Sequence, residues 1–219
     1  MRMLRRIVLI LVAIIILLVA IGYLLPQRVS VARSIEITAP PSVVFPLVSD
    51  LRQAGKWSPW LGIDPNIRVT FSGADVGVGQ MMSWASDNAQ VGSGSQTITE
   101  YEPEGRVVAA LDFGPQGRAV ATTTVEPAGD GSRVTWGFDT DLGMNPVARY
   151  FGLALEGMIA PDFERGLAKL KDVAEAEAAA APAPVAPVEP DAPAPGELPT
   201  TGGMADEAVP ETPADPATP

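Results

Sequence analysis

The chain has 219 residues and a formal net charge of −11, from 15 basic and 26 acidic side chains, and it contains neither cysteine nor histidine. Without cysteine there are no disulfides, thiol nucleophiles or cysteine-ligated metal sites. Without histidine there is no Ser-His-Asp triad and no imidazole acid–base chemistry. The acidic balance also lacks the positive surface of a nucleic-acid-binding protein. Carboxylate, Lys, Tyr or Ser catalysis, an all-oxygen metal site and binding without chemistry remain.

Residues 1–26 are predicted to form an N-terminal transmembrane signal anchor. Three arginines among the first six residues precede an uncharged run of 19 residues, Ile7 to Leu25. At about 1.5 Å per residue the run reaches roughly 28 Å, close to the ~30 Å of a membrane's hydrocarbon core. The alternative is a cleaved signal peptide with Ala20 and Gly22 at its cleavage site, but the apolar part of such peptides has only about 7–15 residues. The arginines predict a single-pass protein with a cytoplasmic N-terminus and its main domain outside the cell membrane, in the periplasm.

Residues 176–219 are predicted to be a disordered acidic tail. This segment holds 11 of the 22 prolines and eight of the 26 acidic residues, and it has no Lys, Arg or aromatic residue. Such a composition cannot bury enough apolar surface to offset the entropy lost on ordering. We expect an extended, partly polyproline-like chain.

Residues 27–175 are predicted to fold as one domain, because about 150 residues can bury close to 70% of their unfolded surface. A first strand, Val29–Ile37, ends at two prolines that open a short helix over 42–47. A second short helix covers Leu51–Trp57. Six strands follow, separated by segments rich in Gly, Pro, Asp and Asn: Ile67–Ser72, Gln80–Ser86, Ser95–Glu102, Val107–Phe113, Ala119–Glu126 and Arg133–Asp141.

The last element is predicted to be a long amphipathic helix that begins near Val147. Its apolar residues are mostly four apart: Phe151, Leu155, Ile159, Phe163, Leu167, Leu170 and Ala174. Pro161 should kink or split this helix near Ala160. The order of elements predicts an α+β fold in which a curved antiparallel sheet of about seven strands wraps around the C-terminal helix.

Short motifs occur in a fixed order along residues 31–175. The first group is Ser34-Ile35-Glu36-Ile37, Ala39-Pro40, Val44-Phe45, Asp50 and Trp57-Ser58-Pro59-Trp60. The second is Ile98-Thr99-Glu100, Glu102-Pro103, Gly129-Asp130-Gly131, Val134-Thr135-Trp136, Pro161-Asp162-Phe163-Glu164 and Gly166-Leu167. The ordered set resembles the SRPBCC superfamily, the START-like helix-grip group, and within it the polyketide cyclase/dehydrase-like branch. The resemblance implies a cavity between the sheet and the C-terminal helix that holds a lipid, an isoprenoid or a polyketide-like ligand.

Aromatic and thioether side chains suit such an adaptable apolar cavity. The residues expected to line it are Trp57, Trp60, Met82, Trp84, Phe113, Trp136, Phe138, Phe151, Leu155 and Met158. For each of them the alternative is ordinary core packing. Trp57 and Trp60 could instead form the cavity mouth or touch the membrane interface. Trp136 should face the C-terminal helix, with Phe151 or Leu155 across from it.

The acid–base candidates are Tyr101, Tyr150 and the carboxylates Asp50, Asp112, Asp139, Asp141, Glu100, Glu102 and Glu104. Asp139 and Asp141 share one strand face, where exposure to solvent is the simpler interpretation, and Asp50 is better explained as a helix N-cap. No spacing resembles an oxygen-ligand metal loop. We therefore predict no catalytic residues, no metal and no cofactor.

Three functions remain. The leading one is a membrane-anchored module that binds a small hydrophobic ligand, with that ligand and the membrane as partners and no nucleic acid. The second is a cyclase or aromatase that uses the same cavity. The third is a protein-interaction platform of the cell envelope, whose protein partners the sequence does not name. The sequence favours the first, because it shows no convergent polar set for catalysis.

Overall fold

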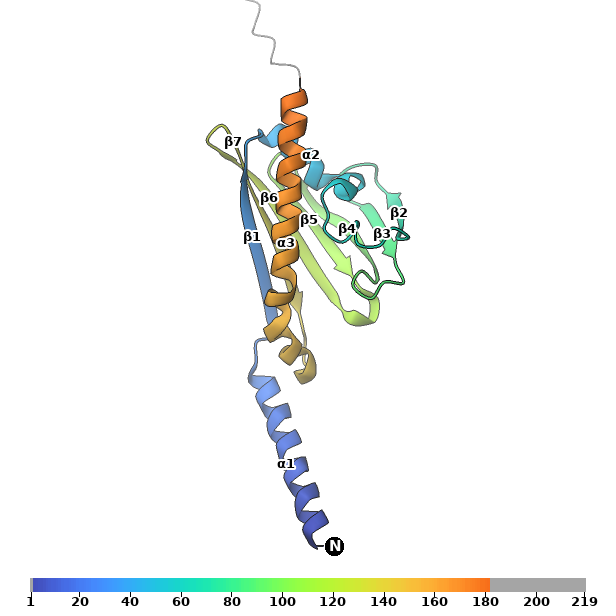
Figure 1. Ribbon diagram of the computed structural model, residues 1–219, viewed down its shortest axis with the longest axis vertical. Helices are drawn as coiled ribbons and strands as arrows, with labels where there is room; N and C mark the ends of the chain where they lie inside the picture. Colours follow the sequence, from blue (N-terminus) through green and yellow to red (C-terminus); the bar gives the residue numbers. More distant parts are fainter. Residues whose placement is uncertain (1, 182–219) are drawn as a thin grey trace, which may run out of the picture. The chain divides into compact units, whose positions relative to one another are not determined.

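A computed structural model describes residues 2–181, and its elements follow the predicted order (Figure 1). They are α1 (Arg2–Leu24), β1 (Arg28–Ile37), α2 (Pro41–Ser49), the 3-10 helix η1 (Leu51–Lys56), β2 (Arg68–Gly73), β3 (Gln80–Ala85), β4 (Ser93–Glu102), β5 (Arg106–Asp112), the 3-10 helix η2 (Gly114–Gln116), β6 (Arg118–Ala128), β7 (Gly131–Asp141) and α3 (Pro146–Ala180). Each strand end lies within two residues of its predicted position.

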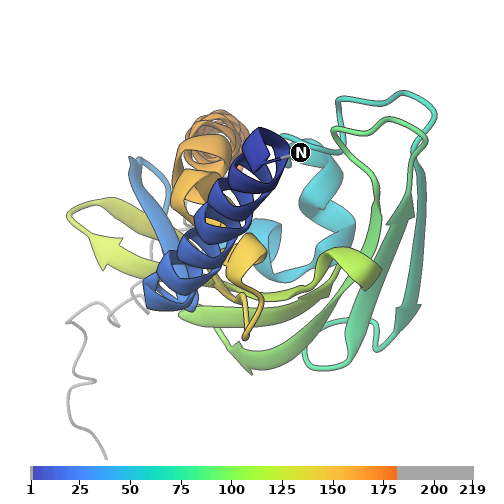
Figure 2. The ribbon, with the colours of Figure 1, turned by 90° about the horizontal axis from the view of Figure 1, so that it is seen from below.

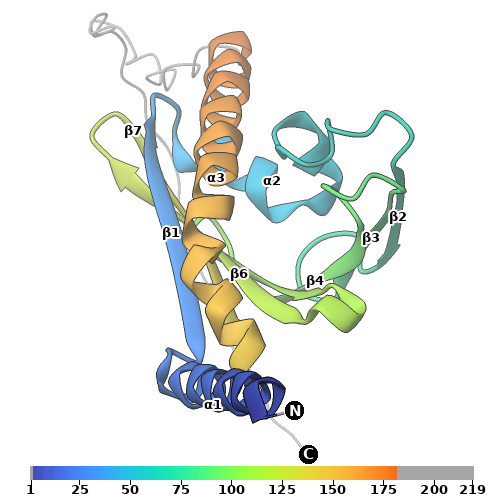
Figure 3. The same cartoon turned by 60° about the horizontal axis from the view of Figure 1, so that its bottom comes forward.

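The seven strands form one antiparallel sheet in the order β1-β7-β6-β5-β4-β3-β2. The sheet curves so that α3 runs along β1 on its concave side and α2 lies within the curve (Figures 2 and 3). A bulge between Ile98 and Glu100 shifts the register of β4, so that Ile98 and Tyr101 both face the concave side although they are three residues apart. The predicted α+β helix-grip architecture is confirmed.

The two short helices begin where the sequence predicts. Pro41 opens α2, where its missing N–H costs no hydrogen bond. The carboxylate of Asp50 accepts a hydrogen bond from the backbone N–H of Arg52 at 3.0 Å, which confirms it as the N-cap of η1. The fully buried amide of Gln80 also donates to Asp50 at 2.7 Å and accepts from Leu51 N at 3.0 Å. These bonds hold η1 against β3.

Helix α3 begins at Pro146, with the side chain of Asn145 accepting from two backbone N–H groups of the first turn. The helix continues without a break through Pro161, so the predicted split is wrong. Buried Ala160 and Phe163 on either side of the proline hold the helix against the sheet, and this packing outweighs one lost backbone hydrogen bond.

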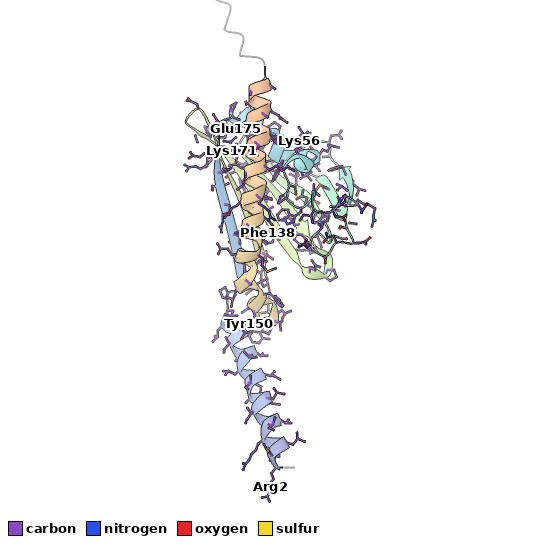
Figure 4. The ribbon with its side chains drawn as sticks, in the orientation of Figure 1. Arg2, Lys56, Phe138, Tyr150, Lys171 and Glu175 are labelled. Carbon is purple, nitrogen blue, oxygen red and sulfur yellow. The ribbon has the colours of Figure 1, made fainter. Side chains whose placement is uncertain are left out.

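The C-terminal part of α3 extends past residue 175, the predicted end of the domain, to Ala180. Two polar contacts fix this last stretch to the domain: Glu175 accepts from Thr38 N at 2.8 Å, and Lys56 pairs with Glu177 at 2.8 Å. Figure 4 shows Lys56 and Glu175 at this end of the helix. The rest of the predicted tail, from residue 182, lies outside the described residues.

The core lies on the concave face of the sheet and has two parts. The larger part joins α2 and α3 to β1, β6 and β7 and includes Val44, Phe45, Leu47, Trp57, Val134, Trp136, Phe163, Leu167 and Leu170. The smaller part joins η1 to β3, β4 and β5 and consists of Leu51, Ala54, Met82, Ile98 and Val107. No residue of α1 belongs to either part.

Helix α1 is long and apolar enough to span a membrane, and Gly22 is its one buried residue. A Cβ atom on Gly22 would lie 2.7 Å from Cβ of Pro146, so the end of α1 approaches the start of α3 more closely than a side chain would allow.

Candidate functional site

Four aromatic rings fill the space between the sheet and the second half of α3. The indole of Trp136, on β7, stacks on the ring of Phe163 from α3, with centroids 4.1 Å apart and an angle of 7° between the planes. Trp57 and Trp60 meet the same indole edge-on, at 5.1 and 5.6 Å. Trp136 is 8% exposed. The predicted residues of this group are therefore packed against one another as core.

Trp57 and Trp60 follow η1, which brings both indoles inward. The indole N–H of Trp57 donates to the carbonyl of Leu47 at 2.8 Å, so this buried ring has no unpaired polar atom. Trp60 is half-buried, and its N–H donates to Asp162 of α3 at 3.2 Å. Both indoles thus join α2 and η1 to α3, which is a packing role.

A second aromatic group lies at the other side of the concave face. Trp84 of β3 and Phe113, which follows β5, meet edge to face at 5.9 Å, and both are half-buried. Gly94 stands opposite Trp84 in the register of β3 and β4. A Cβ on Gly94 would come within 2.6 Å of the indole, so the glycine lets the ring lie across β4. Met82, two residues before Trp84, is buried in the smaller part of the core.

Between the two aromatic groups, small side chains form the floor of the concave face. The cross-strand register aligns Phe138 with Ala121 on β6, and Ala121 with Ala109 on β5. Phe138, Ala121 and the neighbouring Leu111 are half-buried. Helix α3 packs on β1 and β7, whereas α2 and η1 pack on β6, β7 and β3. Ala109 is buried, so the apolar surface beside α3 that is only partly covered is that of Leu111, Ala121 and Phe138.

The remaining three predicted residues belong to the first half of α3. Phe163, and neither Phe151 nor Leu155, lies across from Trp136, so that expectation is wrong. Phe151 and Met158 lie about 120° and 140° around the helix from Phe163, counted at 100° per residue, and both are exposed. Leu155 is half-buried. Two of the ten predicted lining residues thus point away from the sheet.

The arrangement of a curved sheet around a C-terminal helix agrees with a comparison of sequences. A profile of the family described as polyketide cyclase / dehydrase and lipid transport matches residues 28–175, about two thirds of the chain. The chain belongs to this family. No protein of curated function matches the sequence. The family match confirms the resemblance that was drawn from the short motifs.

Solved structures share the fold of the family at low sequence identity. A protein of unknown function from Staphylococcus aureus has a TM-score of 0.53 and 9% identity, and the match covers 69% of this chain and 96% of that one. An uncharacterised protein from Rhizobium leguminosarum has a TM-score of 0.52 and 15% identity, over 68% and 96% of the two chains. A protein from Thermobifida fusca has a TM-score of 0.52 and 20% identity, over 66% and 92%. At these identities the likeness shows the fold alone.

The candidate carboxylates of this family member form surface contacts. The pKa of Asp112 lies below its ordinary value because its carboxylate accepts a hydrogen bond from Gly114 N at 2.8 Å and pairs with Arg118 at 2.9 Å. The pKa of Asp141 is lowered by a hydrogen bond from Gly143 N at 2.8 Å. Lowered pKa values keep both groups ionised at neutral pH, which does not suit a general acid.

The other acid–base candidates have separate positions. Asp139 accepts from Ser30, and Arg106 pairs with both Glu100 and Glu102. The hydroxyl of Tyr150 donates to the carbonyl of Leu18 in α1 at 2.6 Å (Figure 4). Tyr101 is half-buried beside Phe45 and faces the concave side of the sheet. Within residues 2–181, no group of three acidic side chains is placed to hold a metal ion.

Open recesses lie elsewhere on the described part of the chain. One of about 650 Å³ is bordered by Glu36, Glu126 and Arg133, and one of about 230 Å³ is bordered by Arg28, Arg149 and their neighbours. Neither is lined by the predicted cavity residues. The candidate site is the partly covered apolar surface formed by Leu111, Ala121 and Phe138 beside α3.

The predicted lining residues are large side chains and do not include Ala109 or Ala121. Their signal was present in the strand alternation, which places both on the same face as Phe138. The burial of Arg149 was not predicted either, because it depends on the distant carbonyls of Tyr23 and Leu25, which no local pattern reveals.

Proposed function

We propose that this chain is a membrane-anchored member of the polyketide cyclase/dehydrase and lipid transport family that binds a small hydrophobic ligand against the concave face of its sheet. The observation that carries the proposal is the aligned row of Phe138, Ala121 and Ala109. Ala121 is half-buried whereas Ala109 is buried, so the partly uncovered surface lies over Ala121, and the half-buried apolar side chains around it favour an apolar occupant.

The proposal places a ligand next to the stacked aromatic core. Trp136 and Phe163 close one side of the surface, and the Trp84–Phe113 pair lies toward the other. Such rings offer flat apolar area to a lipid tail, an isoprenoid or a polyketide-like molecule. The family description supports this ligand class.

Binding is favoured over catalysis by the placement of the ionisable groups. The candidate carboxylates pair with neighbours on the surface, and their pKa values, where shifted, are lowered. A cyclase or aromatase acting on the same surface would need a proton donor there, and Tyr101 is the candidate that faces it. A role as an interaction platform has no comparable support within the described residues.

Helix α1 is proposed as an uncleaved anchor with its N-terminus in the cytoplasm and the family domain outside the cell membrane. Its exposed apolar surface supports the anchor, and the preceding arginines support this orientation. The full chain should then stay with membranes during carbonate and high-salt extraction. A mature protein whose N-terminus begins near Tyr23 would show cleavage and disprove the anchor.

The ligand proposal is tested by filling the floor of the concave face. Ala121→Phe places a ring where Ala121 meets Phe138, whereas Val120→Phe places the same ring on the opposite face of the same strand, at an exposed position. We expect Ala121→Phe to abolish binding of an apolar fluorescent probe to residues 27–181, and Val120→Phe to leave it unchanged. Native mass spectrometry of the full chain should show a co-purified apolar ligand that Ala121→Phe loses. Equal probe binding by the two variants would contradict the proposal.

A further inference from the structure

The end of α1 is held by a buried arginine of α3. Arg149 is 6% exposed, and its guanidinium donates to the carbonyls of Tyr23 at 2.9 Å and Leu25 at 3.3 Å. It also donates to the carbonyl of Gly143 at 2.8 and 3.0 Å. The last carbonyls of a helix lack partners within the helix and carry partial negative charge, so a buried cation there is well satisfied. Arg149 thereby fixes α1 to the start of α3.

A second contact sets the depth of α3 relative to the apolar run. The Tyr150 hydroxyl donates to the carbonyl of Leu18, seven residues before the run ends at Leu25. Seven helical residues rise about 10 Å, so Tyr150 reaches α1 about 10 Å inside the end of the run. If α1 spans a membrane, the start of α3 lies at the outer boundary of the hydrocarbon.

The first half of α3 carries an exposed apolar face at this level. We define the α3 apolar face as Met144, Val147, Phe151 and Met158, whose side chains are 59–71% exposed. The three helical members fall within about 40° of one another at 100° per residue and point away from the sheet. The same side of the helix becomes charged two turns later, at Arg165 and Lys169.

The length of the α3 apolar face along its helix is close to the length of the apolar run of α1 between Leu18 and Leu25. Met158 comes eight residues after Tyr150, which is about 12 Å along the helix. Whatever the tilt of α3, Met158 therefore lies at most about 12 Å farther than Tyr150 along the membrane normal, away from the cytoplasm. The apolar run itself extends about 10 Å beyond Leu18. The change from apolar to charged residues on α3 therefore occurs close to the level at which the run ends.

We infer that the α3 apolar face is seated in the outer leaflet of the membrane, at the boundary between acyl chains and headgroups. Clustered exposed apolar side chains mark interaction surfaces, and an apolar helix face binds at this boundary. The bilayer is the occupant because α1 and its contacts with Arg149 and Tyr150 hold the face beside it. The inference rests on the anchoring part of the proposed function. It makes α3, which borders the ligand surface, a membrane-contacting element.

The test uses the full chain, which has no native cysteine, with single nitroxide labels in phosphatidylcholine–phosphatidylglycerol nanodiscs. One label replaces Phe151 on the α3 apolar face, and the matched label replaces Lys169 on the same side of the helix. We expect the label at 151 to be several-fold less accessible to a nickel chelate than the label at 169, and more accessible to oxygen. Equal accessibility of the two labels to the nickel chelate would overturn the inference.

A variant of α1 tests whether the contact between the helices causes the seating. Gly22→Leu keeps the span apolar but drives a side chain into Pro146, whereas Ala20→Leu adds the same side chain at an exposed position. Gly22→Leu should expose the label at 151 to the nickel chelate, and Ala20→Leu should not. Protection of the label from both reagents with spin–spin broadening would assign the face to a second copy and overturn the inference. Release of the chain by carbonate would instead disprove the anchor, so the two failures are distinguishable.

Discussion

Replacing Trp136 by alanine is the sharpest test of how the space between sheet and helix is filled. The indole stacks on Phe163 at 4.1 Å and meets Trp57 and Trp60 edge-on, while only 8% of its surface is exposed. Truncating a packed tryptophan costs about 3–5 kcal/mol, from lost burial and from the cavity that remains. Aromatic pairs contribute about 0.5–1.5 kcal/mol each beyond their buried area. We therefore expect Trp136→Ala to fall in the upper part of the first range.

The measurement is the free energy of unfolding of residues 27–181 in urea, since neither part of the core draws on α1. Trp84→Ala is the matched control, because this indole is half-buried and pairs with one ring, that of Phe113. Its cost should be clearly smaller than that of Trp136→Ala. The slope against urea should stay unchanged in both variants, so that the shift in midpoint reports stability.

A cost below about 1 kcal/mol for Trp136→Ala would refute the reasoning, because a packed tryptophan cannot be removed so cheaply. Altered binding of an apolar probe by the same variant would then show that the indole lines an open cavity. A high cost with unchanged probe binding agrees with the structure, in which Trp136 belongs to the core, and with the proposal that the ligand lies over Ala121.

Other measurements test the packing and the ionisable groups. Gly131→Ala should cost about 1–3 kcal/mol of stability by urea unfolding, because its Cβ would lie 2.1 Å from the carbonyl oxygen of Ile37. Phe163→Ala should cost about 3–5 kcal/mol in residues 27–181, and Phe151→Ala less than about 0.5, because only the first ring is buried. Stability should be nearly flat between about pH 6 and 8, since there is no histidine, and should fall as the pH drops below about 4.5. Stability falls with falling pH because the pKa of Asp112 is lower in the folded protein. As the pH drops, the unfolded chain therefore takes up the proton first, which favours unfolding. A stability midpoint between pH 6 and 8 would contradict this.

The strands were predictable because each has local punctuation and a period of two. Gly, Pro, Asp and Asn mark every hairpin, and the alternation of Val134, Trp136 and Phe138 identifies the inward face of β7. The pairing of β1 with β7 joins residues about a hundred positions apart, and no local signal predicts it. That pairing was available only through the resemblance to a family with a known fold.

The candidate site and the burial of residues in α3 were harder to predict, because both depend on how neighbouring elements pack, which residue type does not show. Arginine is usually a surface residue, yet Arg149 is buried because the carbonyls of Tyr23, Leu25 and Gly143 accept hydrogen bonds from its guanidinium. Ala109 and Ala121 matter because they leave space, and a search for large apolar side chains passes over such positions. Both kinds of residue require the neighbouring elements to be placed first.

The apolar pattern of α3 explains both the error about Phe151 and the origin of the α3 apolar face. Residues spaced four apart advance 400° at about 100° per residue, so each step turns the side chain by about 40°. Three steps separate Phe151 from Phe163, and the pattern therefore winds about 120° around the helix between them. A strictly core-facing helix alternates steps of three and four, as α3 does at Phe163, Leu167, Leu170 and Ala174, all of them buried. The steps of four before Phe163 carry the apolar pattern from the sheet to the outside, so one sequence pattern serves the core at one end of α3 and the proposed membrane contact at the other.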